Sequence, residues 1–317
     1  MKEIGGYIEL ESFHLPMMHE RAIALNCGRN ALAYLIKARG IKRLWIPSFL
    51  CDSVPNVCKR EGIACLLYGV GYNFLPSQEI ELGEGEWLYL VNYYSQITNE
   101  QIEAFAAKYR HVIVDNAQSY FQMPVPGIDT LYTCRKYFGV ADGAFLYTEA
   151  VLNEEFPVDE SYGRMFFLLG RFERTASEFY SGYVENNKLF KNEPIKRMSR
   201  LTQNLLHGID YAAVEKKRRE NYEYLHAKIG KCNLLSLSET GTFMYPFLIK
   251  NGLKLRKNLQ KKNIYIPTLW PSVFEITGSG DLEYNMAQNI LPLPIDQRYG
   301  QTDMDRLIKE IIQGEDE

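Results

Sequence analysis

The 317-residue chain has 46% hydrophobic and 24% charged residues and a net charge of −3, a composition typical of a globular protein without long disordered spans. Because the net charge is small and the basic residues are scattered, nothing in the composition points to nucleic acid or an anionic membrane as a partner. The length exceeds that of most single cores and predicts two domains, or one large domain with an appendage.

The cysteines and histidines are distributed as in a cytoplasmic protein without a metal centre. None of the six cysteines forms a C-x-x-C pair, so we expect reduced thiols. The five histidines are dispersed, and His14 and His19 are spaced wrongly for two ligands on one helical face. The first residues lack the apolar core of a signal peptide, and no apolar run approaches the length of a membrane span. We therefore expect a soluble, cytoplasmic protein with no membrane partner.

The first predicted helix follows Cys27. Apolar residues recur at helical spacing over residues 31–36, behind a start formed by Gly28, Arg29 and Asn30. Glycine at a helix amino terminus lets backbone amides approach an anion, and the helix dipole favours negative charge there. The start of this helix is therefore a candidate anion site, although a glycine before a helix is weak evidence alone.

Strands and helices alternate after this helix. The sequence predicts strands at residues 44–46 and 64–70 with a helix between them, and an apolar strand over residues 87–96. Thr98, followed three residues later by Gln101, has the pattern of a capping box and predicts the start of an amphipathic helix. The alternation indicates an α/β fold with a mostly parallel sheet covered by helices, in which ligands lie beyond the carboxyl ends of the strands.

The stretch from Arg110 to Thr148 contains the candidate chemistry. An apolar strand ends in Asp115, and Lys136 follows after a gap that can carry the chain from one strand end to the next in a βαβ-type protein. The carboxylate and the amine can therefore converge at one edge of a sheet. Pyridoxal phosphate (PLP) chemistry requires such a pair, because the lysine binds the cofactor covalently and the carboxylate keeps the pyridine nitrogen protonated.

The second half of the chain predicts more helices and a smaller domain. Residues 152–191 are helical and contain too many aromatic residues for one stripe, so they either pack in the core or face a second subunit. Residues 210–230 form a long charged helix, and a strand, a helix, a turn marked by proline and a closing helix follow it. We expect a large domain at residues 1–230 and a small C-terminal domain at residues 231–317.

Several motifs resemble those of the DegT/StrS family of PLP-dependent sugar aminotransferases. The segment VDNAQSY resembles the family's EDAAQA segment, and CRKYFGVADGAFLYT resembles its lysine loop. GRNAL resembles the phosphate-binding turn, PIKRMSRLTQNLL a cross-dimer motif, and RRENY the interdomain helix, so the resemblance covers nearly the whole chain. It implies the aspartate aminotransferase fold (fold type I), with a large PLP-binding domain and a smaller C-terminal α/β domain.

The resemblance also implies roles for individual residues. Lys136 would bind the cofactor covalently and transfer a proton, and Asp115 would keep its ring nitrogen protonated. Gln118 would donate a hydrogen bond to the ring hydroxyl. The cofactor phosphate is expected at Gly28, Arg29, Asn30 and Thr133.

Two positions depart from the family pattern. Cys51 stands where the family often has an aromatic residue that stacks on the pyridine ring. Two alternatives remain for this contact: Phe49, or a ring stacked only by smaller groups. Ile195 stands where the family has an asparagine that reaches the neighbouring subunit, and Asn186 and Asn187 are the nearby alternatives.

By resemblance, the substrate would be a keto sugar, nucleotide-linked, with an amino acid such as glutamate as donor, in amino-sugar or surface polysaccharide biosynthesis. Asn92, Tyr94 and Trp270 are candidates for the substrate wall, and a homodimer is expected. Two alternatives remain: a homologue that binds PLP without turnover, and a PLP-dependent sugar dehydratase. Lys136 speaks against the dehydratase, because relatives with that activity replace the lysine by histidine. The sequence does not identify the sugar, the position of its keto group or the donor.

Overall fold

A seven-stranded sheet forms the larger part of the protein. The computed structural model describes residues 4–316, with residues 315 and 316 as backbone only. The sheet has the order β1-β7-β6-β5-β4-β2-β3, and β7 runs antiparallel to both of its neighbours while the other strands are parallel to one another. The strands are β1 (Ile23–Leu25), β2 (Arg43–Pro47), β3 (Ala64–Tyr68), β4 (Glu86–Val91), β5 (Val112–Asp115), β6 (Asp129–Thr133) and β7 (Ala144–Tyr147).

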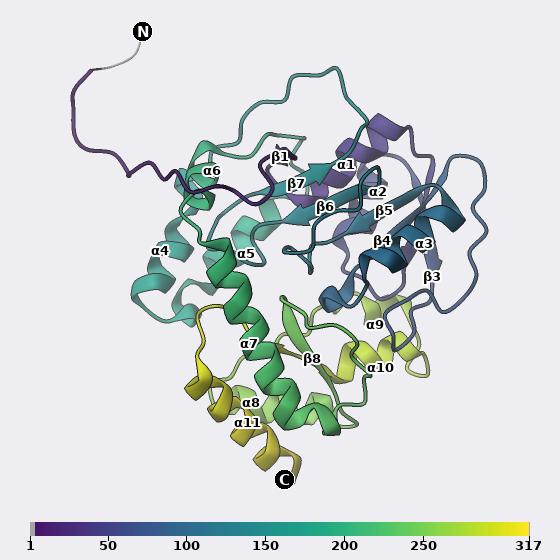
Figure 1. Cartoon of the computed structure of the whole chain (residues 1–317), viewed down its shortest axis with the longest axis vertical. Coiled ribbons are helices and arrows are strands. Elements are labelled where there is room, and N and C mark those ends of the chain that lie inside the picture. The colour runs from purple at the N-terminus through teal and green to yellow at the C-terminus, as the bar shows by residue number, and fades with distance from the viewer. Residues whose placement is uncertain (1–3, 317) are drawn as a thin grey trace.

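Helices cover this sheet and continue the chain into a smaller unit (Figure 1). The helices of the first part are α1 (Gly28–Arg39), α2 (Ser53–Arg60), α3 (Asn99–Tyr109), α4 (Phe166–Glu173), α5 (Tyr180–Leu189), α6 (Arg200–Leu206) and α7 (Tyr211–Ile229). The smaller unit contains a two-stranded antiparallel sheet of β8 (Met244–Leu248) and β9 (Ile290–Pro294), with α8 (Gly252–Lys261), α9 (Val273–Ile276), α10 (Leu282–Asn289) and α11 (Gln301–Asp316). None of the helices in the described residues is both long and apolar enough to cross a membrane.

The predicted capping box is confirmed. The hydroxyl of Thr98 accepts a hydrogen bond from the backbone N–H of Gln101, and the Gln101 side chain accepts one from the backbone N–H of Thr98. The strand expected over residues 87–96 is shorter than predicted, because it ends at Val91 and a 3-10 turn with left-handed backbone at Tyr94 follows. Parallel strands that are buried on both faces also explain the near-continuous apolar runs in the sequence.

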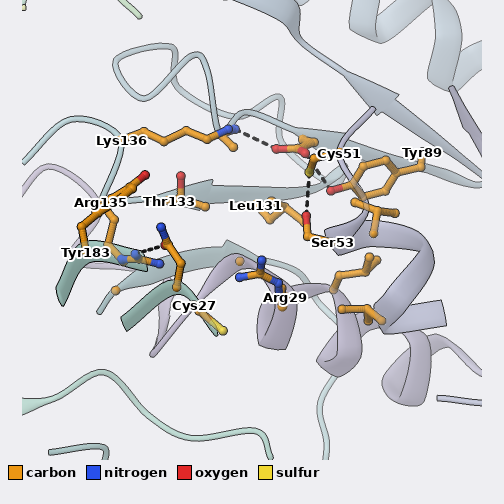
Figure 2. Close-up of a pocket in the computed structure, with 18 residues that line it drawn as sticks. Cys27, Arg29, Cys51, Ser53, Tyr89, Leu131, Thr133, Arg135, Lys136 and Tyr183 are labelled. Atoms are coloured by element: carbon orange, nitrogen blue, oxygen red, sulfur yellow. Dashed lines mark hydrogen bonds between the residues drawn. The ribbon is translucent and has the colours of Figure 1, made fainter. Parts of the chain in front are cut away.

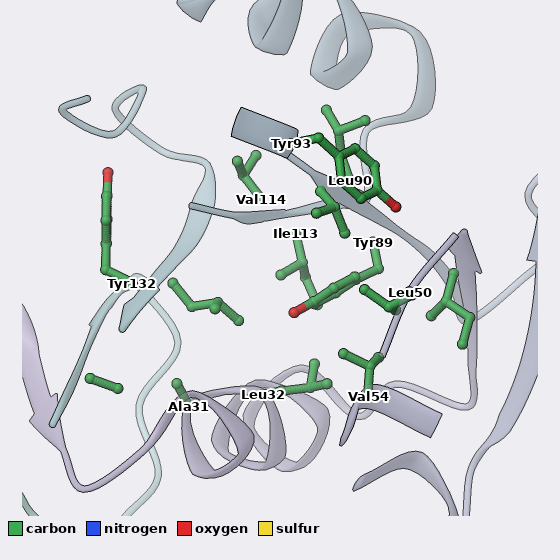
Figure 3. Packing of buried hydrophobic residues seen from close by; sticks show 14 of the residues in the cluster. Ala31, Leu32, Leu50, Val54, Tyr89, Leu90, Tyr93, Ile113, Val114 and Tyr132 are labelled. Carbon is green, nitrogen blue, oxygen red and sulfur yellow. The ribbon is translucent and has the colours of Figure 1, made fainter. Parts of the chain in front are cut away.

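Apolar side chains pack on both faces of the large sheet (Figure 3). Tyr89 of β4 and Ile113 of β5 point toward α1, where they meet Leu32, whereas Leu90 and Val114 point to the opposite face. This alternation follows from the two-residue period of a strand. The packing of Tyr89 and Ile113 against Leu32 holds α1 on this face, with its amino-terminal end beside the carboxyl ends of β5 and β6.

A second cluster of buried apolar residues joins α7 to the smaller unit. Figure 1 shows α7 running from the first part of the chain to β8, α8 and α11. Tyr222, Leu225 and Ile229 of α7 pack in this cluster together with residues of β8, β9, α8 and α11. The second core therefore already begins within α7, while the boundary expected at residue 230 stays a prediction.

Candidate active site

A cavity of about 240 Å³ lies where β5 and β6 end and α1 and α2 begin (Figure 2). It is the place at which open α/β sheets bind ligands, beyond the carboxyl ends of parallel strands. Its polar lining residues are Cys27, Arg29, Cys51, Ser53, Tyr89, Asp115, Thr133, Arg135, Lys136, Tyr183 and Asn187. The structure thus brings Asp115 and Lys136 into one cavity, as the sequence predicts.

Asp115 is the only acidic residue among the described residues that line this cavity. Its Oδ1 accepts a hydrogen bond from the backbone N–H of Ala117 over 2.8 Å, and its Oδ2 accepts one from the hydroxyl of Tyr89 over 2.8 Å. Burial and the charge of Asp115 raise the pKa of Tyr89 well above its ordinary value, so this phenol stays a donor. The carboxylate is therefore fixed in orientation from two sides.

Lys136 lies in the loop after β6, two residues from the buried Cys134. Its side chain is exposed and extends along the cavity (Figure 2). The Nζ atom lies 5.4 Å from the ring centroid of Phe243, within the range of a cation–π contact. The primary amine is therefore accessible to a ligand in the cavity.

The opposite end of the cavity is basic. Arg29 lies in the first turn of α1, whose backbone N–H groups carry partial positive charge. Arg135 donates to the side chain of Asn187, with its Cζ 4.9 Å from the ring centroid of Phe190, and burial lowers its pKa. Two guanidinium groups beside a helix amino terminus favour an anion such as phosphate.

Thr133 and Gly28 add two observations that fit a phosphate group at this end. The buried Oγ1 of Thr133 has no hydrogen-bond partner among the described residues, although buried hydroxyls are normally paired. A Cβ atom at Gly28 would lie 2.7 Å from Cγ2 of Thr133, so only glycine fits there without displacement. The cavity therefore suits a ligand with an anionic group at one end and a group that meets Asp115 and Lys136 at the other.

Asn30 does not reach this cavity. Its side chain is fully buried and donates to Asn26 over 2.8 Å and to the carbonyl of Pro194 over 2.7 Å. Its Oδ1 accepts a hydrogen bond from Arg60 over 3.0 Å. All polar atoms of this side chain are engaged behind α1, so Gly28 and Arg29 face the cavity without it.

Gln118 and Phe49 also lie outside the cavity lining. The Oε1 of Gln118 accepts a hydrogen bond from the backbone N–H of Tyr94 over 2.8 Å. Phe49 is buried against Trp270, with ring centroids 4.5 Å apart. The structure instead places Cys51 in the lining, where its Sγ lies 2.7 Å from Oγ of Ser53.

The three residues predicted at the substrate wall are buried away from this cavity. Asn92 binds the backbone of Ile97 through both its side-chain atoms, with distances of 2.9 and 3.1 Å. Tyr94 and Trp270 belong to an aromatic cluster of the main core, with ring centroids 6.5 Å apart. None of the three lines this cavity or the larger one that adjoins it.

Other lining residues were missed by the sequence analysis. Arg135 stands immediately before Lys136, and a second cation beside the lysine was the signal that could have identified it. Tyr89 and Ser53 gave no such signal. Of the two nearby asparagines, Asn187 contacts Arg135, whereas Asn186 donates to the carbonyl of Ala141 over 2.8 Å.

A second cavity of about 760 Å³ adjoins the first and shares Arg135, Lys136 and Tyr183 with it. Its walls are mainly apolar side chains of α4 and α5, with Phe243 on the side of the smaller unit. Arg171 adds positive charge, whereas Arg298 is ion-paired with Asp296 in the same lining. Lys136 therefore stands between a small polar cavity and a larger, more apolar one.

No protein-family model matches the chain, and no curated protein matches it in sequence. Solved structures match it in fold. A DegT DnrJ EryC1 StrS aminotransferase from Brucella abortus aligns with a TM-score of 0.60 and 15% identity, over 92% of this chain and 85% of that one. A sugar aminotransferase from Micromonospora echinospora gives a TM-score of 0.64 and 14% identity, over 94% and 88%.

A further structure, NtdA from Bacillus subtilis with its cofactor PMP bound, aligns with a TM-score of 0.63 and 12% identity. The match covers 93% of this chain and 73% of that one. The chain therefore has the fold of these aminotransferases, and the expected fold class is confirmed.

Proposed function

We propose that the chain is a PLP-dependent aminotransferase that transfers an amino group from an amino acid, with glutamate as the first candidate, to a keto sugar. The observation that carries this proposal is the single cavity that contains Lys136, Asp115 and the basic end with Arg29 and Thr133. These groups match the aldehyde, the ring nitrogen and the phosphate of PLP. The fold shared with sugar aminotransferases supports the same reading.

Each residue has its own task in this proposal. When bound, PLP supplies the electron sink that lets an amino acid lose its α-proton. Lys136 binds the cofactor through Nζ and, once released, moves a proton to and from the substrate carbon. Asp115, oriented by Tyr89, stabilises a positive charge on the ring nitrogen. Arg29 and the unpartnered hydroxyl of Thr133 bind the phosphate with the amino terminus of α1.

The second cavity supports a sugar-sized substrate beside Lys136. Its volume of about 760 Å³ lies within the range of small-molecule sites. Arg171 lines it, and a guanidinium group suits the phosphates of a nucleotide-linked sugar, whereas Arg298 is already paired with Asp296. We therefore include a nucleotide-linked keto sugar, and a role in amino-sugar or surface polysaccharide biosynthesis, in the proposal.

The apolar surface of α4 and α5 supports the homodimer in the same proposal. Phe166, Leu169, Phe172 and Tyr180 are 71%, 64%, 93% and 63% exposed. An apolar surface of this kind beside a cavity is typical of a protein–protein contact. A second subunit on this face would close the larger cavity, whose lining includes Phe172 and Tyr180.

A reducing, cytoplasmic setting also belongs to the proposal, because all six cysteines are free thiols.

A half-reaction assay tests the proposal. Purified protein is loaded with PLP, mixed with glutamate and other amino acids in turn, and assayed for the keto acid product. We expect keto acid from at least one donor, and then an aminated product from a nucleotide-linked keto sugar by mass spectrometry. Lys136→Ala should form neither, whereas Lys108→Ala, an exposed lysine paired with Glu79, should match the wild type. Absence of keto acid from every donor would contradict an aminotransferase.

A further inference from the structure

Arg218 of α7 is a buried cation that the proposed reaction does not use. Its side chain is 2% exposed, and all four of its hydrogen-bond acceptors are neutral oxygens. Burial of a guanidinium group is unfavourable unless its donors are satisfied, and here burial lowers its pKa. The contacts of Arg218 should therefore show what the buried charge does.

The contacts of Arg218 converge on the residue after Lys136. Its Nη2 donates to the backbone carbonyl of Tyr137 over 3.2 Å, and its Cζ lies 4.6 Å from the centroid of the Tyr137 ring. The same carbonyl accepts a second hydrogen bond from Nε2 of Gln297 over 2.9 Å. Nε of Arg218 donates in turn to Oε1 of Gln297 over 2.8 Å, which closes a ring of three contacts.

Arg218 also contacts the segment that carries Phe243. Its Nη1 donates to the carbonyl of Thr242 over 2.8 Å and lies 3.4 Å from the carbonyl of Phe243. The Phe243 ring is the one that lies 5.4 Å from Nζ of Lys136. One guanidinium group therefore contacts both the backbone next to Lys136 and the backbone of the residue whose ring lies beside its amine.

We infer that Arg218 and Gln297 are positioning residues for Lys136. They hold the backbone at Tyr137 and at Phe243 to α7 and the β9–α11 loop. Gln297 follows β9 in the smaller unit, and Lys136 follows β6 in the large sheet. The position of the Lys136 amine therefore depends on the position of the smaller unit. The inference rests on the proposed function, in which the amine of Lys136 is the reacting group.

The first arm of the test uses protein without PLP. Lysines are labelled with trinitrobenzenesulfonate, and the labelling rate of Lys136 is compared by peptide mass spectrometry with that of exposed Lys108. We expect the two rates to differ in the wild type and to become more alike in Arg218→Met and Gln297→Leu. Arg219→Met is the matched control, because Arg219 is the exposed neighbour that pairs with Glu215 on the same helix.

The second arm measures capture of PLP by Lys136, separately from PLP affinity. Arg218→Met should slow borohydride-trapped capture by about tenfold to hundredfold, since small misplacements of a reacting group have effects of this size. Gln297→Leu removes one hydrogen bond and should slow capture by up to about tenfold. Arg218→Lys should restore part of the rate, and Arg219→Met should leave it unchanged.

The outcomes separate this inference from the proposed function. If circular dichroism shows that Arg218→Met does not fold, the labelling and capture results of Gln297→Leu test the positioning role instead. If the wild type captures PLP, and the folded variants show the same labelling and the same PLP capture as the wild type, the positioning role is wrong while the proposed function stands. If the wild type does not capture PLP, the proposed function fails. The labelling experiment then still tests whether Arg218 and Gln297 position Lys136. Equal labelling of Lys136 and Lys108 in the wild type would contradict a positioned amine.

Discussion

Tyr89 donates a hydrogen bond from its buried hydroxyl to Oδ2 of Asp115, so the carboxylate at the end of β5 is oriented from the neighbouring strand β4. A hydrogen bond to a charged group contributes about 1.5–3 kcal/mol. We expect Tyr89→Phe to lower kcat by roughly tenfold to hundredfold, because the carboxylate then faces the cofactor ring without this donor. Steady-state kinetics with saturating PLP measure this effect.

Tyr68→Phe is the control for Tyr89→Phe. The hydroxyl of Tyr68 is also buried, and it donates to the backbone carbonyl of Tyr89 over 2.8 Å without contacting Asp115. Both variants should lose stability, by about 0.5–1.5 kcal/mol for the hydrogen bond of Tyr68. Equal kcat values for the two variants would show that the contact with Asp115 has no catalytic effect.

The contact between Gly28 and Thr133 gives a second prediction. A Cβ at residue 28 would meet Cγ2 of Thr133 at 2.7 Å, so Gly28→Ala should displace the groups around the proposed phosphate site. We expect PLP affinity to fall by about tenfold or more, since displacement by a fraction of an ångström weakens charge-assisted hydrogen bonds. Fluorescence titration with PLP measures the dissociation constant.

The double variant Gly28→Ala with Thr133→Ser is the internal control. Serine keeps the hydroxyl and removes the methyl group that the new Cβ meets, so the double variant should recover most of the lost affinity. Such non-additivity is expected of residues in direct contact. If the double variant binds PLP no better than Gly28→Ala, the contact is not the cause.

His19 predicts a loss of stability in mild acid. Its ring is fully buried, with Nε2 donating to the carbonyl of Tyr120 over 2.9 Å and Nδ1 accepting from the hydroxyl of Tyr147 over 3.1 Å. Burial lowers its pKa from 6.5 to about 4. The folded state therefore binds this proton less readily than the unfolded state, so its stability contribution is present above pH 6.5 and is lost as the pH falls toward 4.

The linkage amounts to about 3 kcal/mol between these two pH values. Urea unfolding at pH 6.5 and at about pH 4 should show a larger loss in the wild type than in His19→Gln, which cannot take up this proton. His14→Gln, at an exposed histidine, should lose as much as the wild type. Equal losses in all three proteins would assign the acid sensitivity to other groups.

The meeting of Asp115 and Lys136 could be predicted from the sequence because their positions depend on topology. Asp115 ends a buried strand and Lys136 follows the next one, and parallel strands bring their carboxyl ends to one sheet edge. The helix start at Gly28 and the capping box at Thr98 are likewise local signals. Patterns of this kind do not depend on distant parts of the chain.

Asn30 and Phe49 lie outside the cavity because their placement depends on side-chain direction and distant partners. A helix turns by about 100° per residue, so Gly28 and Arg29 can face the cavity while Asn30 points to Pro194, a residue far away in sequence. Phe49 is drawn into a cluster with Trp270 of the smaller unit. No local pattern indicates either partner.

The proposed function requires that Lys136 binds PLP in the cavity that contains Asp115. The most direct measurement is borohydride reduction of the protein incubated with PLP, followed by peptide mapping, beside Lys136→Ala and Lys108→Ala. We expect one stable label on Lys136 in the wild type and in Lys108→Ala, and none at this site in Lys136→Ala. A wild-type protein without label, or with label distributed over exposed lysines, would contradict it.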